Sequence, residues 1–236
     1  MFNETMKKAA SAYGLDLTSR QLQQFCLFRD ELVETNKVMN LTAITDDEGI
    51  AVKHMIDSLS CYDTACFPEG ASVLDLGTGA GFPGLPLLIY RPDLQVTFFD
   101  SLNKRLTFLQ GLTEKMGLSA SFLHGRAEDM AHQKEYREAF DVVTSRAVAR
   151  LPILAEWALP YVRQGGYFIS LKGAQYEEEV AASKGALQIL GAVVAEIRPV
   201  HLPGLDDTRA VIYMKKIKGS PKKYPRKPKA AARQPL

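Results

Sequence analysis

Hydrophobic residues recur with two different periods along this chain, and the change of period falls near residue 70. Before it, apolar positions repeat every three to four residues, as on one face of a helix. This spacing predicts a helix over residues 18–37, with Thr18 as its N-cap and Gln21 as its partner in a capping box. A second helix is predicted over residues 46–61, and a Phe-Pro-Glu-Gly turn at 67–70 ends the helical region.

Beyond residue 70, short apolar runs alternate with longer amphipathic stretches. The runs predict strands and the stretches predict helices, a pattern typical of a parallel sheet covered by helices on both faces. The predicted strands are residues 72–76, 95–99, 120–124, 140–145, 166–171, 193–199 and 209–215. The predicted helices are residues 83–91, 103–117, 128–137, 151–163 and 175–191.

The last two predicted strands follow five parallel ones and are joined by a loop that contains Pro203 and Gly204. We therefore expect an α/β fold, a Rossmann-like sheet of seven mostly parallel strands whose last strand inserts antiparallel. Three regions are expected: an N-terminal helical extension over 1–70, the sheet domain over 71–215 and a tail over 216–236. Because the tail contains four prolines, we expect it to be extended or flexible.

Charge is unevenly distributed, although the formal net charge is only +2. Nine Lys/Arg and no acidic residue lie between Lys215 and Leu236, which leaves 20 basic and 27 acidic residues in the body. The body is therefore formally −7 and carries a basic tail. Such a tail fits a protein that grips phosphate backbones, although a basic run also occurs as a solvated extension.

The composition is that of an ordinary globular protein, with 46% hydrophobic and 24% charged residues. Its three cysteines, Cys26, Cys61 and Cys66, form an odd set without metal-like spacing, so we expect free thiols and no metal site. No stretch approaches the length of a membrane span and the N-terminus has no apolar signal segment. We expect a cytoplasmic protein without a membrane partner, and a monomer.

The stretch Val73–Gly84, V-L-D-L-G-T-G-A-G-F-P-G, joins a predicted strand to a predicted helix through a glycine-rich turn. Its spacing, Asp75-x-Gly77-x-Gly79-x-Gly81, differs from the G-x-G-x-x-G fingerprint of dinucleotide-binding proteins. An acid before the first glycine would repel a pyrophosphate but suits a ligand with a positive sulfonium and an amino group. S-adenosylmethionine is such a ligand, although glycines alone can also mark a simple tight turn.

Two further strand ends supply groups that suit a nucleoside. The second strand ends at Asp100, whose carboxylate can accept hydrogen bonds from ribose hydroxyls. Ala127 and Glu128 follow the third strand, where a backbone N–H and a carboxylate can contact an adenine edge. Each acid has an alternative role, because Asp100 can cap the helix near Asn103 and Glu128 suits a first helical turn.

The fourth strand ends in Thr-Ser-Arg-Ala at 144–147 and lacks the Asn/Asp-Pro-Pro-aromatic turn of enzymes that methylate amino groups. A nucleophile with a free lone pair, such as guanine N7, needs only alignment with the methyl group, so we assign no catalytic base. Arg146 is expected to position the cofactor carboxylate, the guanine edge or an RNA phosphate. Its alternative is a salt bridge with Asp75 or Glu128.

Basic residues near the same edge of the sheet, and in the tail, are candidates for binding RNA. They are Arg146, Lys172, Arg209, Lys222, Lys223 and Arg226. Two other classes of protein stay open. A nucleotide-binding oxidoreductase would need a longer glycine fingerprint, and a non-catalytic RNA-binding factor would leave the cofactor site unused.

With these residues together, the chain resembles the bacterial small-subunit ribosomal RNA guanine-N7 methyltransferase family, long labelled glucose-inhibited division protein B. The resemblance covers nearly the whole chain and is most specific in the Phe82-Pro83-Gly84 extension of the glycine loop. The matching segments are residues 40–42, 54–59, 75–84, 100–101, 145–147, 171–173 and 221–227.

The resemblance implies a class I methyltransferase fold with S-adenosylmethionine as cofactor. It also implies methyl transfer to N7 of one guanine of 16S rRNA, near the decoding region of the small ribosomal subunit. By resemblance, cofactor contacts come from Gly77, Phe82, Ala127, Glu128 and Arg146. With the strand-end argument and the loop glycines, the expected cofactor set is Gly77, Gly79, Gly81, Phe82, Asp100, Ala127, Glu128 and Arg146.

Overall fold

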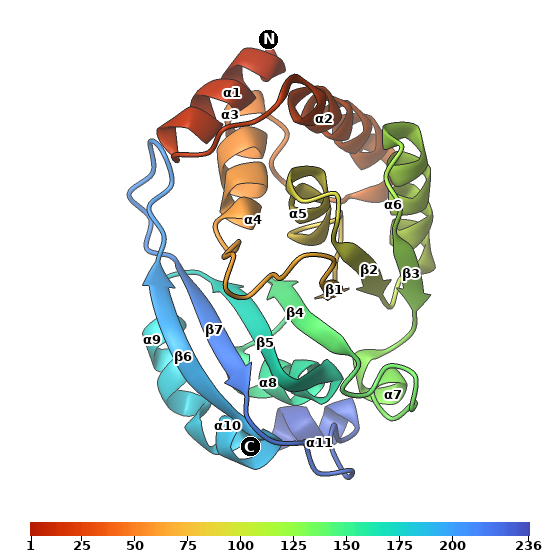
Figure 1. The fold of residues 1–236 in the computed structure, drawn as a ribbon, viewed down its shortest axis with the longest axis vertical. Helices are drawn as coiled ribbons and strands as arrows, with labels where there is room; N and C mark the ends of the chain where they lie inside the picture. The colour runs from red at the N-terminus through yellow and green to blue at the C-terminus, as the bar shows by residue number, and fades with distance from the viewer.

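Seven strands form one sheet through the middle of the protein, and the computed structural model describes residues 1–236 (Figure 1). The strands are β1 (Ser72–Leu76), β2 (Gln95–Asp100), β3 (Ser121–His124), β4 (Phe140–Arg146), β5 (Val162–Lys172), β6 (Ala192–Pro199) and β7 (Ala210–Lys216). Their order is β3-β2-β1-β4-β5-β7-β6, with β1 to β5 parallel and β7 antiparallel between β5 and β6. The predicted Rossmann-like class, with seven mostly parallel strands, is confirmed.

Helices cover both faces of the sheet (Figure 1). The N-terminal ones are α1 (Phe2–Ala12), α2 (Ser19–Met39), α3 (Asp47–Gly49), η1 (Ile50–Ile56) and α4 (Asp57–Leu59). The others are α5 (Gly84–Tyr90), α6 (Asn103–Met116), α7 (Ala127–Met130), α8 (Leu151–Ala158), η2 (Leu159–Tyr161), α9 (Tyr176–Ala182), α10 (Lys184–Leu190) and α11 (Pro228–Arg233). None of these helices is both long enough and apolar enough to cross a membrane.

Each face of the sheet has its own apolar core. The larger core joins Phe25 and Phe28 of α2 to Leu109 of α6 and to Val73 and Phe98 of the sheet. The smaller core joins α8 and α10 to the opposite face. Because the N-terminal helices bury their apolar side against the sheet and its helices, they are held rigidly beside the ends of the central strands.

Two of the N-terminal helices begin where the sequence predicts, whereas α1 was not predicted. The Thr18 hydroxyl accepts from the Gln21 backbone N–H at 3.3 Å, and the Gln21 carboxamide oxygen accepts from the Thr18 N–H at 2.8 Å. The helix predicted over 46–61 runs without interruption through α3, η1 and α4, and its middle section η1 is a π-helix. π-helical turns often mark functional sites, and η1 carries Lys53 and His54.

Three predicted helices are shorter than expected. The one predicted over 151–163 ends at Ala158, and β5 begins at Val162, four residues before the strand predicted over 166–171. The one predicted over 128–137 stops after the single turn α7, where the Arg137 guanidinium donates to the Ala131 carbonyl at 3.1 Å. That carbonyl is an acceptor that a continuing helix would need for its own backbone. The one predicted over 175–191 is broken at Ser183, whose hydroxyl donates to the backbone carbonyl four residues earlier at 2.7 Å.

The basic tail differs most from expectation, because it packs against α8 and ends in the short helix α11 (Figure 1). Tyr224 is 6% exposed, and the fully buried Lys216 donates to the Leu159 carbonyl at 2.6 Å. Arg226 pairs with the carboxylate of Glu156, which is fully buried on α8, at 2.7 Å. The prediction of a flexible tail is wrong, because the tail is packed on α8. Its Arg226 supplies the cation that the buried Glu156 carboxylate needs.

Replacing Arg226 with Ala leaves the buried Glu156 carboxylate without its partner. We expect the free energy of unfolding, measured by urea denaturation, to fall by about 3 kcal/mol, as for other broken buried pairs. Lys222→Ala removes an exposed cation of the same tail and should change this free energy by less than about 0.5 kcal/mol. Equal stability of the two variants would show that the pair does not hold the tail.

Candidate cofactor and substrate site

The glycine loop after β1 crosses the carboxyl end of the sheet. The Gly77 N–H donates to the carbonyl of Phe99 in β2 at 2.8 Å. Gly77, Gly79 and Gly81 have φ angles of +72°, +60° and +103°, which L side chains rarely adopt. A Cβ on Gly77 would also lie 2.5 Å from Cγ2 of Val148. Glycine is therefore required at residue 77 by both backbone conformation and space.

The Asp75 carboxylate is fully buried behind this loop. It accepts hydrogen bonds from the Thr78 hydroxyl at 2.6 Å, the Gly84 N–H at 3.0 Å and the Thr144 hydroxyl at 3.2 Å. Burial raises the pKa of Asp75 to about 6, and these three hydrogen bonds oppose the rise. Asp75 therefore fastens the loop to β4, rather than facing a ligand as its place in the sequence had indicated.

A first cavity of about 330 Å³, the nucleoside cavity, opens where β1, β2 and β3 end. Asp100 lines it at the end of β2 and is 4% exposed. Its Oδ2 accepts from the Gly79 N–H at 3.0 Å and pairs with the Arg105 guanidinium at 3.2 Å. Its Oδ1 accepts from the Leu102 N–H at 2.9 Å. Asp100 thus joins the glycine loop to the residue before α6, and its binding of ribose hydroxyls stays a prediction.

Glu128 supplies the nucleoside cavity with a buried acceptor that has no partner. Its side chain is 8% exposed and its Oε1 makes no hydrogen bond, since the Arg126 guanidinium lies 3.9 Å away. Ala127 is held beside it, with its carbonyl accepting from the Tyr161 hydroxyl at 2.6 Å. Because buried polar atoms are nearly always partnered, Oε1 fits a ligand that donates a hydrogen bond, such as an amino group.

The expected cofactor residues fall into three groups in the structure. Those that line the nucleoside cavity are Gly77, Asp100, Ala127 and Glu128. Those that shape the loop and its packing are Gly79, Gly81 and Phe82. Arg146 lines a neighbouring cavity instead.

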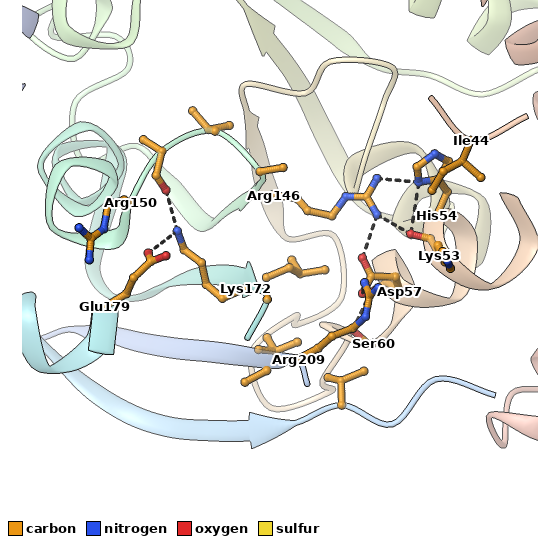
Figure 2. A pocket seen from close by; sticks show the side chains of 18 residues that line it. Ile44, Lys53, His54, Asp57, Ser60, Arg146, Arg150, Lys172, Glu179 and Arg209 are labelled. Atoms are coloured by element: carbon orange, nitrogen blue, oxygen red, sulfur yellow. Dashed lines mark hydrogen bonds and ion pairs between the residues drawn. The ribbon is translucent and has the colours of Figure 1, made fainter. Parts of the chain in front are cut away.

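This second cavity, the basic cleft, has a volume of about 560 Å³ (Figure 2). Ala147 and Val148 line both cavities, so the short loop after β4 is the wall between them. Five cationic side chains line the basic cleft: Lys53, Arg146, Arg150, Lys172 and Arg209. The structure therefore places a cleft suited to an anionic partner next to the nucleoside cavity.

Arg146 ends β4 and is held by the N-terminal helices. Its guanidinium donates to Asp57 Oδ2 at 2.8 Å, the Lys53 carbonyl at 3.0 Å and His54 Nδ1 at 3.2 Å (Figure 2). It also lies over the ring of Phe82, 4.7 Å from the centroid. Its salt bridge is to Asp57, rather than to Asp75 or Glu128, the two partners considered from the sequence.

His54 completes this cluster. Its ring stacks on Phe82 with 4.7 Å between centroids, and its Nε2 lies 2.7 Å from the Thr42 hydroxyl. Burial, and then the charge of Arg146, lowers the pKa of His54 to about 4. The imidazole is therefore neutral at pH 7. Its Nδ1 lies 3.2 Å from both the Arg146 guanidinium and the Lys53 carbonyl, and we assign Nδ1 as acceptor because the guanidinium can only donate. Spacing alone singles out neither Thr42 nor His54, although both lie in segments that carry the family resemblance.

Only part of the expected RNA-binding set lines the basic cleft. Lys172 lies 2.8 Å from Glu179, and Arg209 lies 3.1 Å from Asp57. These two cations and Arg146 are thus oriented by carboxylates of the same cleft. The three tail residues do not line it: Lys222, Lys223 and Arg226.

A mostly parallel sheet in the order β3-β2-β1-β4-β5-β7-β6, with a glycine loop after β1 and an acid at the end of β2, is the Rossmann-like fold that class I methyltransferases share. A solved structure titled a predicted O-methyltransferase, Atu636 from Agrobacterium tumefaciens, is similar in fold. Its TM-score is 0.55 at 20% identity, over 71% of this chain and 83% of that one.

The family model described as rRNA small subunit methyltransferase G matches residues 21–208. Two similar relatives carry the name Ribosomal RNA small subunit methyltransferase G. The one from Alkaliphilus metalliredigens is 44% identical over 98% of this chain and 97% of its own length. The one from Lactobacillus acidophilus is 46% identical over 96% and 95%. The chain belongs to the rRNA small subunit methyltransferase G family.

The enzyme therefore uses S-adenosylmethionine, and the nucleoside cavity fits that cofactor. The Glu128 Oε1 is an acceptor without a partner, and the Asp100 carboxylate lines the same cavity at the end of β2. Gly77 keeps the loop free of a side chain where the cavity meets Val148. These residues would hold the nucleoside half of the cofactor.

Gly77→Ala forces a Cβ against Val148 and should weaken binding of S-adenosylhomocysteine at least tenfold in calorimetric titrations. Gly14→Ala is the matched control, because Gly14 also has a positive φ, of +82°, but has open space around it. The control should bind the ligand as the unchanged protein does. Undiminished affinity in Gly77→Ala would place the cofactor elsewhere.

His54 should stay neutral at pH 5.5, which NMR of the imidazole ¹⁵N signals can measure. Because an unfolded histidine titrates near pH 6.5 and the folded one near 4, unfolding takes up a proton between these values. The contribution of His54 to stability is therefore lost as the pH falls through this window. Titration of the folded ring near pH 6.5 would contradict the buried, Arg146-bonded state.

Proposed function

We propose that the protein transfers the methyl group of S-adenosylmethionine to N7 of a guanine in 16S rRNA, near the decoding region of the small subunit. The names of its relatives point to small-subunit ribosomal RNA. The single observation that carries the proposal is the wall formed by Ala147 and Val148, which separates the nucleoside cavity from the basic cleft. Because the methyl group must pass directly from donor to acceptor, we place the reacting atoms at the edge of this wall, where the two cavities adjoin.

When bound, S-adenosylmethionine supplies an electrophilic methyl group on a sulfonium. Residues of this chain then contribute mainly alignment, which alone can account for a large share of the rate. Asp100 and Glu128 orient the nucleoside from one side of the wall. Arg146 orients the nucleic acid from the other side.

The basic cleft offers no free general base. Both nitrogens of His54 are bonded, to Arg146 and to Thr42, and its lowered pKa leaves little basicity. Asp57 is paired with two arginines, and Glu179 with Lys172 and a backbone N–H. A nucleophile that has no proton to lose suits such a site. Guanine N7 is one, and its O6/N7 edge is a common partner of arginine.

The cations around the cleft would hold the RNA backbone. Arg150 is 61% exposed at the cleft mouth, whereas Lys172 and Arg209 are largely buried by their carboxylate partners. We assign Arg150 to phosphate binding and the buried pair to the shape of the cleft. Lys222 and Lys223, which are exposed on the tail, are proposed as outlying phosphate contacts.

The direct experiment maps N7-methylguanine in 16S rRNA from cells with and without the gene. We expect one modified guanine near the decoding region to disappear without the gene and to return when the gene is restored. A restoring copy with Gly77→Asp, which adds bulk and negative charge to the cofactor site, should not return it. An unchanged pattern of N7-methylguanine would refute the assignment of the substrate.

Arg146→Gln should lower the rate of methyl transfer to small subunits about 100-fold, as for a displaced positioning group. Affinity for S-adenosylhomocysteine should stay within twofold, because Arg146 does not line the nucleoside cavity. Arg163→Gln, which removes a surface ion pair with Asp141, is the control. Loss of cofactor affinity in Arg146→Gln would instead place Arg146 at the cofactor.

We also propose that the enzyme works in the cytoplasm as a monomer. All three cysteines are free thiols, in keeping with a reducing compartment. Light scattering of the purified protein tests the second point, and a mass twice that of the 26.1 kDa chain would contradict it.

A further inference from the structure

Trp157, the sole tryptophan of the chain, lines the nucleoside cavity from α8. Its indole Nε1 is buried and has no hydrogen-bond partner. An indole N–H can only donate, so it lacks an acceptor. Buried donors without an acceptor are rare in folded proteins, and this one belongs to a residue that lines a binding cavity.

The lining of the same cavity contains a second buried atom without a partner, Oε1 of Glu128. The two atoms come from different helices, α8 and α7, which contact one another. One is a donor and the other, as a carboxylate oxygen, is an acceptor. A planar ligand with both an amino group and ring nitrogens satisfies the pair, and adenine has this chemistry.

The helix that carries Trp157 is fixed at two points. At its start, the Leu151 N–H donates to the Glu179 carboxylate at 2.6 Å. Near its end, Glu156 is clamped by Arg226 of the tail at 2.7 Å. Because successive residues point about 100° apart around a helix, Glu156 can face the tail while Trp157 faces the cavity. The indole is therefore presented by a rigid support.

We propose that Trp157 binds the adenine of the cofactor by donating its indole N–H to a ring nitrogen, while Glu128 accepts from the 6-amino group. Trp157 is then a specificity-determining residue for the methyl donor. The inference concerns cofactor binding alone and does not depend on which nucleotide of the RNA is methylated.

The first test is calorimetric titration of the full chain with S-adenosylhomocysteine. Trp157→Phe keeps an aromatic ring but removes the donor, and we expect binding about tenfold weaker, as for one lost hydrogen bond. Tyr176→Phe removes a polar atom from an aromatic residue outside the cavity and should bind normally. Equal affinities of Trp157→Phe and the unchanged protein would overturn the proposal.

The second test identifies the acceptor with the 1-deaza, 3-deaza and 7-deaza analogues of S-adenosylhomocysteine. The unchanged protein should bind one analogue about tenfold more weakly, and for that analogue Trp157→Phe should cause no further loss. If Trp157→Phe weakens the binding of all three analogues equally, Trp157 contributes only ring packing, and its role as a donor is refuted. The test does not depend on the variant's folding. If the unchanged protein binds all three analogues equally, no ring nitrogen accepts a hydrogen bond from Trp157 and the proposal is refuted.

Tryptophan fluorescence, excited selectively over tyrosine, gives an independent readout, because Trp157 is the sole tryptophan. Saturation with S-adenosylhomocysteine should change its intensity with the dissociation constant measured by calorimetry. Emission that stays unchanged at saturation would show that the ligand does not reach the indole.

Discussion

The arrangement of the site depends on one buried carboxylate. Asp75, at the end of the central strand β1, accepts hydrogen bonds from the glycine loop, from Gly84 at the start of α5 and from Thr144 of β4. Burial alone would favour its protonated form, and the raised pKa records that cost. The three donors hold the loop at the strand end, and the nucleoside cavity, the Val148 wall and the position of Phe82 follow from it.

Phe82 links the glycine loop to the basic cleft. Its ring packs between Phe28 of α2 on one hand and His54 and Arg146 on the other. The N-terminal helices therefore complete the site, since Asp57 and the Lys53 carbonyl fix the guanidinium that ends β4. The C-terminal tail has a corresponding role for the cofactor side, because it clamps the helix that presents Trp157.

Elements with strong local signals could be predicted from the sequence, including the strands, the Thr18 capping box and the gathering of three strand ends around one cavity. What could not be predicted depends on contacts between residues distant in the chain. Asp57 and Arg146 form an ion pair, although β1, β2, β3 and the start of β4 lie between them along the chain, and no periodicity of the sequence links them. Likewise, the tail has the composition of a flexible segment, and only the buried Glu156 reveals why it folds back.

The central claim is that the methyl donor lies in the nucleoside cavity and the acceptor in the basic cleft, and that they meet at the edge of the Ala147–Val148 loop, which borders both. A crystal structure with S-adenosylhomocysteine tests it most directly. The account predicts adenosine beside Asp100 and Glu128 in the nucleoside cavity, with the sulfur against this wall and toward the basic cleft. Adenosine bound in the basic cleft, or a sulfur turned away from Arg146, would contradict it.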